Sequence, residues 1–359
     1  MKLKVPEYYQ EFKCIANKCK DTCCKGWEID IDNKTFEYYL NVKGDFGKKV
    51  KCNISQDEPH HFIFNTDGKC PFLNNSNLCD IFINLGEEHL CQICALHPRY
   101  FEWFKDLKES GIGLCCEEAA RIILSQNKLF KTYEIDIPFE DCDNYDDNIF
   151  SILEALREDI IKYLSNNSIP LNIRIYNILK NTKIIQNNID IKSFSYDFEF
   201  IDFKCDNIKN DLKPLLNFFL KLEYLDRDFK KSLENGISHY DILNQNSEQV
   251  KDFTKANPEV NTYLENIAIY FVWRYFLKGV FDYDIWSKIN LMVVSLIIIK
   301  FLFICKWLEN DTLSFDDCII IAKKYSQEIE YSDDNLKILA QASYDNYFFS
   351  SNYLSGLLL

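Results

Sequence analysis

The feature that most constrains this chain is the uneven distribution of its cysteines. Eleven of the 15 cysteines lie within the first 116 of 359 residues. The start, MKLKVPEYYQEF, has neither an apolar core segment nor a small-residue cleavage site, so the sequence predicts no secretory signal. Disulfides do not persist in the reducing cytosol, and a dense group of cysteines there indicates metal ligation or redox chemistry. We therefore expect a cytoplasmic protein whose N-terminal part folds around metal-bound thiolates.

The charge of the chain argues against two classes of partner. The formal net charge is −14, whereas a phosphate backbone or an anionic membrane is bound by clustered Lys and Arg. We therefore expect no nucleic-acid partner and no membrane partner. The longest apolar stretch, residues 289–307, carries Lys300 near its middle. It is interpreted as a buried core helix rather than a membrane span.

The chain divides into two parts of different character. Residues 1–137 combine the cysteines with turn residues and short apolar pieces, which predicts an irregular cysteine-rich domain closed by a helix from Glu117 to Leu129. Over residues 148–359 apolar side chains recur at helical spacing, which predicts an α-helical domain. The acidic stretch 138–147 is the predicted linker. The expected fold class is mainly α, with the irregular metal-binding domain packed on the helical one.

Three features of the second part predict local structure. Residues 261–281 and 283–307 are expected to form two long apolar helices. Ser314 is the predicted N-cap of a helix running to about Tyr325, with Asp317 as its capping-box partner. Arg274 lies within the first apolar helix, where a buried guanidinium needs an anionic partner.

All the N-terminal cysteines except Cys52 lie in four short motifs. These are Cys14-x4-Cys19-x3-Cys23-Cys24 before Gly26-Trp27; Cys70-Pro71-Phe72-Leu73 with Leu78-Cys79; Cys91-x2-Cys94 before His97-Pro98-Arg99; and Cys115-Cys116-Glu117-Glu118-Ala119-Ala120-Arg121. Adjacent cysteines are unusual in tetrahedral zinc knuckles, whereas iron–sulfur sites accept thiolates at more varied spacings. The pattern favours an iron–sulfur cluster and leaves zinc as the alternative, because thiolates suit both.

Two common cofactor-binding signatures are not visible in the sequence. With only ten glycines, no Gly-rich turn follows a convincing strand, so a Rossmann-like cofactor domain is not predicted. The radical motif Cys-x3-Cys-x2-Cys is also missing, because Gly26 stands at its third position after Cys19 and Cys23.

Taken together, these motifs resemble the flagellin lysine N-methylase family and the wider group of zinc- or iron-chelating proteins with clustered cysteines. The resemblance is detailed over residues 8–125 and weaker at Leu156-Arg157 and Pro170-Leu171 with Arg174. Glu117 departs from the proline expected there. Cys52, Cys91 and Cys115 are additional to the family pattern. That pattern selects eight metal-binding candidates: Cys14, Cys19, Cys23, Cys24, Cys70, Cys79, Cys94 and Cys116.

The resemblance implies methyl transfer from S-adenosylmethionine to lysine side chains of flagellin, by a protein that carries a [4Fe–4S] cluster. A cubane takes up to four thiolates, so eight cysteines can serve two metal sites, or one site plus structural thiols. The motifs do not select the four ligands, the S-adenosylmethionine site or the general base. The alternative from another functional class is a metal-binding or redox-sensing interaction protein without enzymatic activity.

Overall fold

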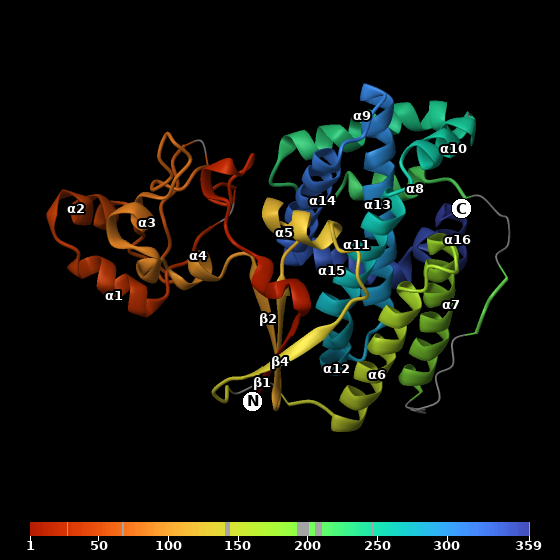
Figure 1. Ribbon diagram of the computed structural model, residues 1–359, viewed down its shortest axis with the longest axis horizontal. Coiled ribbons are helices and arrows are strands. Elements are labelled where there is room, and N and C mark those ends of the chain that lie inside the picture. The colour runs from red at the N-terminus through yellow and green to blue at the C-terminus, as the bar shows by residue number, and fades with distance from the viewer. Residues whose placement is uncertain are drawn as a thin grey trace.

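The computed structural model describes residues 1–26, 28–66, 68–140, 144–191, 201–204, 210–245 and 247–358. Most of the described chain is helical, which confirms the prediction of a mainly α fold (Figure 1). Trp27 of the first cysteine motif lies outside the described residues, as do Cys142 and Cys205.

A four-stranded sheet, which the sequence did not predict, joins distant parts of the first 137 residues. Its strands are β1 (Lys2–Pro6), β2 (Arg99–Phe104), β3 (Leu107–Ile112) and β4 (Thr132–Asp136), in the order β2-β3-β1-β4. Strands β2 and β3 form an antiparallel hairpin with Arg99 opposite Ile112. Strand β1 lies parallel to β3 and antiparallel to β4. The chain start is thereby held in the middle of the sheet.

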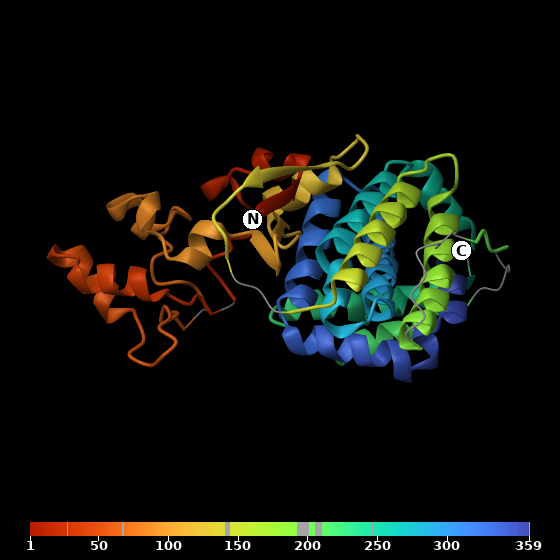
Figure 2. The same ribbon diagram turned by 90° about the horizontal axis from the view of Figure 1, so that it is seen from below.

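Residues 24–96 form a small separate unit, named here the cysteine lobe. Figures 1 and 2 both place it to one side of the remaining helices, beyond the sheet. Its elements are α1 (Asn33–Asn41), α2 (Gly44–Cys52), α3 (Asp80–Leu85), η3 (Glu87–His89) and α4 (Gln92–Leu96). Before the lobe the chain forms the short helices η1 (Glu7–Glu11) and η2 (Ala16–Lys18). The lobe has its own core of ten buried residues, among them Cys70 and Cys91.

The other helices form the second unit, named here the helical body. They are α5 (Glu117–Leu124), α6 (Asp147–Leu164), α7 (Leu171–Asp190), α8 (Lys213–Phe219), α9 (Arg227–Gln245), α10 (Ser247–Ala256), α11 (Val260–Tyr275), η4 (Phe276–Lys278), α12 (Gly279–Asp282), α13 (Trp286–Asn310), α14 (Phe315–Glu330), α15 (Asp333–Asp345), η5 (Tyr347–Phe349) and α16 (Ser351–Leu358). Among the described residues beyond Asp136, every named element is helical.

Helix α13 is the centre of the helical body. It packs against α7, α9, α11, α14 and α15. By length and composition alone it is apolar enough to cross a membrane, but 78% of its most apolar 18-residue window is buried inside the protein. This packing agrees with the interpretation of residues 289–307 as a core helix.

Helix boundaries follow the sequence predictions in part. Ser314 caps α14 with the expected reciprocal bonds to Asp317, although the helix runs to Glu330 rather than ending near Tyr325. The first long apolar helix was predicted to reach residue 281, but it ends as α11 at Tyr275. The short elements η4 and α12 follow, and the chain turns at Tyr283, whose φ of 59° is left-handed. The prediction for α5 was wrong at its end: the helix stops at Leu124, not Leu129, because side chains take up its last carbonyl groups.

The first 137 residues contribute to two cores rather than one. Residues of η1, the sheet and α5 belong to the main core of the helical body. The lobe core is separate from it. The predicted domain limits, 1–137 and 148–359, stay a prediction, and residues 141–143 of the predicted linker lie outside the described residues.

Two buried ion pairs stabilise the region where the sheet meets the helical body. Arg157 on α6 binds Glu109 on β3 through two contacts of 2.6 Å, and the two side chains are 1% and 5% exposed. Arg274 on α11 lies 3.0 Å from Glu330 at the end of α14. This pair confirms that Arg274 has an anionic partner.

Candidate functional site

Five thiols lie together in the core of the cysteine lobe. Cys70 and Cys91 are buried, and the other three thiols pack against the same core. Cys79 occupies the N-cap position of α3, and Cys91 that of α4, three residues before Cys94, without a side-chain capping bond in either case. The five are Cys24, Cys70, Cys79, Cys91 and Cys94. Four of them belong to the eight predicted ligands; the fifth, Cys91, does not.

The thiol pair of Cys91 and Cys94 shows why their spacing matters. Two intervening residues at the start of α4 bring the side chains within hydrogen-bonding distance, and the thiol of Cys94 donates to Cys91. This bond lowers the pKa of Cys91 and raises that of Cys94. Asp32 Oδ2 accepts from Gln92 N at 2.8 Å and so fixes the first turn of α4 beneath the pair. Within the pair, Cys91 is therefore the thiol that loses its proton more easily.

The remaining lobe thiols are close enough to influence one another. Burial raises the pKa of Cys70 to about 12, and the neighbouring Cys24, Cys79 and Cys91 act in the same direction. Burial also raises the pKa of Cys79, again with a contribution from Cys24. These thiols therefore stay protonated at neutral pH unless a cation binds beside them, because coordination deprotonates a thiol.

A second group of thiols lies at the junction between the lobe and the helical body. Its members from the predicted set are Cys14, Cys19, Cys23 and Cys116. Cys116 caps α5. Hydrogen bonding to Cys24 is the main cause that raises the pKa of Cys23, and the charges of Cys116 and Cys14 add to it. The same bond lowers the pKa of Cys24 to about 7. The adjacent Cys23 and Cys24 thus connect the two thiol groups.

Two acidic residues fix the segment that carries Cys19. The thiol of Cys19 lies 3.0 Å from the Asp21 carbonyl oxygen and 3.5 Å from Glu117 Oε2. Glu117, only 2% exposed, accepts from Lys20 N at 2.7 Å. The residue that departs from the expected proline at the start of α5 therefore holds the Cys19 segment against that helix.

The helical body also reaches the junction thiols. Lys323 on α14 is 2% exposed at its side chain and pairs with Asp21 at 2.6 Å. Burial, followed by the charge of Lys323, lowers the pKa of His97 to about 4. Tyr331 Oη donates to the thiol of Cys115 at 2.9 Å. The junction is thus a mixed polar site built from both parts of the chain.

The donor set fits a thiolate-held metal group in chemistry. Thiolates suit both iron–sulfur clusters and zinc, and the lobe core presents five thiols on a small scaffold. In the described ranges, no three Cys, His, Asp or Glu side chains converge closely enough to hold a metal ion as they stand. The lobe thiols are therefore neighbours rather than ligands already placed around one centre.

The cysteines that the family pattern selects are not the same as those that the structure buries near one another. Cys91 and Cys115, additional to the family pattern, are buried beside predicted ligands, whereas Cys14 of the predicted set is exposed. Cys52, the third additional residue, is also exposed. The signal for Cys91 was its Cys-x2-Cys spacing to Cys94, which is a typical ligand spacing. The eight-cysteine set itself stays a prediction.

Comparison with known proteins adds two findings. A family model described as the FliB lysine N-methylase C-terminal domain matches residues 157–357, more than half of the chain. The match therefore lies in the helical body, whereas the motifs discussed above lie in the first 125 residues. No solved structure matches the chain.

Curated relatives match over a shorter stretch. A lysine-N-methylase of Salmonella typhimurium is 28% identical over 127 residues, which is 33% of this chain and 32% of that protein. The lysine-N-methylase of Salmonella choleraesuis matches with the same identity and coverage. The flagellar biosynthetic protein FliU of Salmonella muenchen is 28% identical over 127 residues, or 33% of this chain and 75% of that protein. The match thus spans about a third of the two curated lysine-N-methylases.

Proposed function

The chain belongs to the FliB lysine N-methylase family, and on that premise we propose that it transfers methyl groups from S-adenosylmethionine to lysine side chains of flagellin. The observation that carries this proposal is the family match over more than half of the chain. The thiol-rich lobe supports it, because the cysteine motifs independently resemble the same family. We propose further that the protein acts in the cytoplasm.

The reaction itself needs no radical chemistry. A neutral ε-amino nitrogen of lysine forms a bond to the sulfonium methyl group as the carbon–sulfur bond breaks, which leaves S-adenosylhomocysteine. The lysine must first lose its proton, and its ordinary pKa near 10.4 makes this unfavourable at neutral pH. The protein therefore has to desolvate the amine or to supply a base.

We propose that residues 1–137 act as the metal-binding domain and carry a [4Fe–4S] cluster held in the cysteine lobe. Of the eight predicted cysteines, Cys24, Cys70, Cys79 and Cys94 share the lobe core, and four thiolates are what a cubane needs. Cys91 lies beside them as a further donor. When bound, such a cluster supplies a rigid cross-link between the loops of the lobe. The junction thiols, Cys14, Cys19, Cys23 and Cys116, would then orient the lobe or serve a second metal site.

The rival proposal is a metal-binding or redox-sensing protein that carries zinc and has no enzymatic activity. The observation behind it is the presence of two hydrogen-bonded thiol pairs, in which the pKa of Cys24 falls to about 7 and that of Cys91 is lowered. Thiols with lowered pKa values are the more reactive ones. Such a sensor would bind no S-adenosylmethionine.

A methylation assay tests the proposed function. Anaerobically purified protein is incubated with flagellin and S-adenosylmethionine, and the intact mass of flagellin is measured. The proposal expects mass increases equal to whole methyl groups on lysines, lost in Cys79→Ser and retained in the matched control Cys52→Ser, whose thiol is exposed. Unmodified flagellin with metal-loaded wild-type protein would contradict the methylase and favour the rival.

A further inference from the structure

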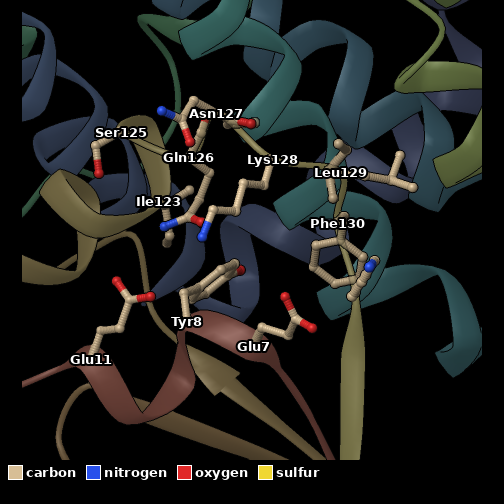
Figure 3. A pocket seen from close by; sticks show the side chains of 13 residues that line it. Glu7, Tyr8, Glu11, Ile123, Ser125, Gln126, Asn127, Lys128, Leu129 and Phe130 are labelled. Atoms are coloured by element: carbon tan, nitrogen blue, oxygen red, sulfur yellow. The ribbon is translucent and has the colours of Figure 1, made fainter.

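An open pocket lies at the C-terminal end of α5, the end opposite to the junction thiol Cys116. Its cavity volume is about 260 Å³, and it is enclosed by η1, the loop 125–131 after α5 and one side of α11 (Figure 3). Helix α5 has eight residues, so at about 1.5 Å per residue its two ends are about 12 Å apart. The pocket is therefore separated from Cys116 by about the length of α5, and no cysteine lines it.

The pocket is bounded by a loop that other elements hold in place. Asn266 on α11 donates through Nδ2 to the carbonyl oxygens of Leu124 and Gln126, at 3.1 and 2.8 Å. At the other end of the loop, Glu7 N donates to the carbonyl oxygen of Lys131 at 2.9 Å. These bonds are also the reason that α5 ends before the predicted Leu129. A loop held at both ends offers a largely preformed site, as small-ligand sites usually are.

The rim of the pocket carries two charges of each sign. Glu7 and Glu11 come from η1, and Lys128 and Lys131 from the loop. All four residues are exposed, and within the described ranges none of them forms an ion pair. Figure 3 shows the two carboxylates on either side of Tyr8, with the Lys128 side chain extending toward Tyr8 from the opposite wall. The rim thus presents both signs of charge within one small opening and has no net charge.

The floor of the pocket offers a polar atom and an apolar surface. Tyr8 is 7% exposed, and its ring meets the Phe130 ring edge-on at 6.4 Å. No residue of the described chain forms a hydrogen bond with its hydroxyl group. Burial raises the pKa of Tyr8, so the hydroxyl stays neutral and can both donate and accept. Ile123 and Ile269 complete the apolar wall.

We propose that this pocket binds the α-amino-acid end of S-adenosylmethionine, with Glu7 and Glu11 facing its ammonium group and Lys128 and Lys131 facing its carboxylate. The assignment rests on the proposed function and adds the location of the methyl donor. A zwitterion is the ligand whose charges match this rim. A lysine side chain of the protein substrate would be repelled by Lys128 and Lys131, and an anion by the two glutamates. The methylene stem would pack on Phe130 and the two isoleucines, and the adenosyl part would extend through the open side.

Binding measurements test the assignment without relying on turnover. S-adenosylhomocysteine keeps the amino-acid end of the donor, whereas 5′-methylthioadenosine lacks it. Calorimetric titration of the full chain with both compounds therefore isolates the contribution of that end. We expect Glu11→Gln and Lys128→Met each to weaken S-adenosylhomocysteine binding about tenfold, because each removes a charge-assisted contact. Binding of 5′-methylthioadenosine should be unchanged.

Two matched variants control for overall charge and folding. Glu234→Gln and Lys255→Met remove equal charges from exposed positions of the helical body away from the pocket, and they should leave both affinities as in the wild type. Thermal unfolding of every variant checks that the chain is intact. If the wild type prefers S-adenosylhomocysteine and the pocket variants bind it equally well, this assignment is overturned while the proposed function stands. Equal weakening of both compounds would also overturn it. If the wild type binds neither compound, the proposed function fails together with the assignment.

Discussion

The helical body and the cysteine lobe bury very different amounts of apolar surface. The body surrounds α13, in which 18 residues from Trp286 to Cys305 are buried. The lobe core has ten buried residues, of which Cys70 and Cys91 are two. Folding must offset roughly 1–2 kcal/mol of backbone entropy per residue. The body offsets this entropy by burying its apolar side chains, whereas the lobe buries too few apolar side chains to do the same.

The difference indicates what each part requires in order to fold. The lobe spans residues 24–96, a length at which a single apolar core rarely supplies more than about 3–5 kcal/mol. Natural domains of this size add disulfides or a metal, and all the described cysteines are free. The comparison therefore predicts a lobe whose fold depends on its thiol-bound group and a body that folds without it.

The largest expected effect is the loss of the lobe fold when the proposed metal group is removed. Treatment with a strong chelator, or the Cys79→Ser substitution, should abolish the slow amide exchange of residues 24–96, because structural metal binding is coupled to folding. Helices α11 and α13 should keep their protection. Hydrogen exchange with mass spectrometry measures both regions at once, with Cys52→Ser as the matched control. Equal loss of amide protection in the lobe and in the body would contradict the prediction that only the lobe depends on metal for its fold.

A smaller effect, confined to the body, is expected for Arg157→Met. The variant leaves Glu109 buried without its bidentate partner, which should lower the free energy of unfolding by about 3–5 kcal/mol. Urea denaturation monitored by helical circular dichroism gives the value. The double variant Arg157→Met/Glu109→Leu should recover much of the loss, since it removes both charges. Metal content per chain should not change; a loss of metal in the single variant would show that the two parts are more tightly coupled than the comparison predicts.

His97 predicts a pH dependence at the junction. Its pKa falls from an ordinary 6.5 to about 4, chiefly through burial, so the folded state favours the neutral imidazole. The stability that this contributes is complete above pH 6.5 and is lost progressively as the pH falls from 6.5 to about 4, by about 3 kcal/mol in total. The His97→Gln variant has no imidazole to titrate. The difference in unfolding free energy between wild type and variant should therefore shrink as the pH falls from 6.5 to about 4. A constant difference between pH 7 and pH 4 would contradict the burial of His97.

The smallest effect is expected at the start of α14. Ser314→Ala removes the side-chain cap of Asp317 N and should lower the free energy of unfolding by about 1 kcal/mol. Ser238→Ala, on the exposed side of α9, is the matched control and should change stability little. Helix α14 also carries Lys323, which pairs with Asp21, so a change at its start can affect the junction. Amide hydrogen exchange in the residues just before the lobe measures that effect. No change there would confine the effect to the body.

Local signals in the sequence were sufficient for much of the helical body. The capping box of Ser314 and Asp317 and the apolar run of α13 depend on neighbours in the chain, so they could be identified from the sequence alone. The need of Arg274 for an anion was also predictable from its surroundings. Its partner Glu330 was not, because the two residues come together only in the folded body, where α11 and α14 both pack against α13.

Non-local contacts account for what the sequence did not show. Strand β1, KLKVP, pairs with β3 far along the chain, and its five residues are too few to predict a strand from their pattern alone. The end of α5 depends on Asn266 of α11. Glu117, which stands where the family resemblance leads one to expect proline, accepts a hydrogen bond from the backbone of Lys20 far away in the sequence. The grouping of Cys24 with Cys70 and Cys79 likewise required the fold of the lobe.

The most direct test of the account is the metal and acid-labile sulfide content of protein purified without oxygen. The account predicts iron and sulfide in near-equal amounts with broad visible absorption, retained in Cys52→Ser and lost in Cys79→Ser. Stoichiometric zinc without sulfide would contradict the cluster and leave the lobe with a structural metal. Protein that contains neither metal, yet shows slow exchange throughout residues 24–96, would contradict the central claim that thiol-bound metal holds the lobe together.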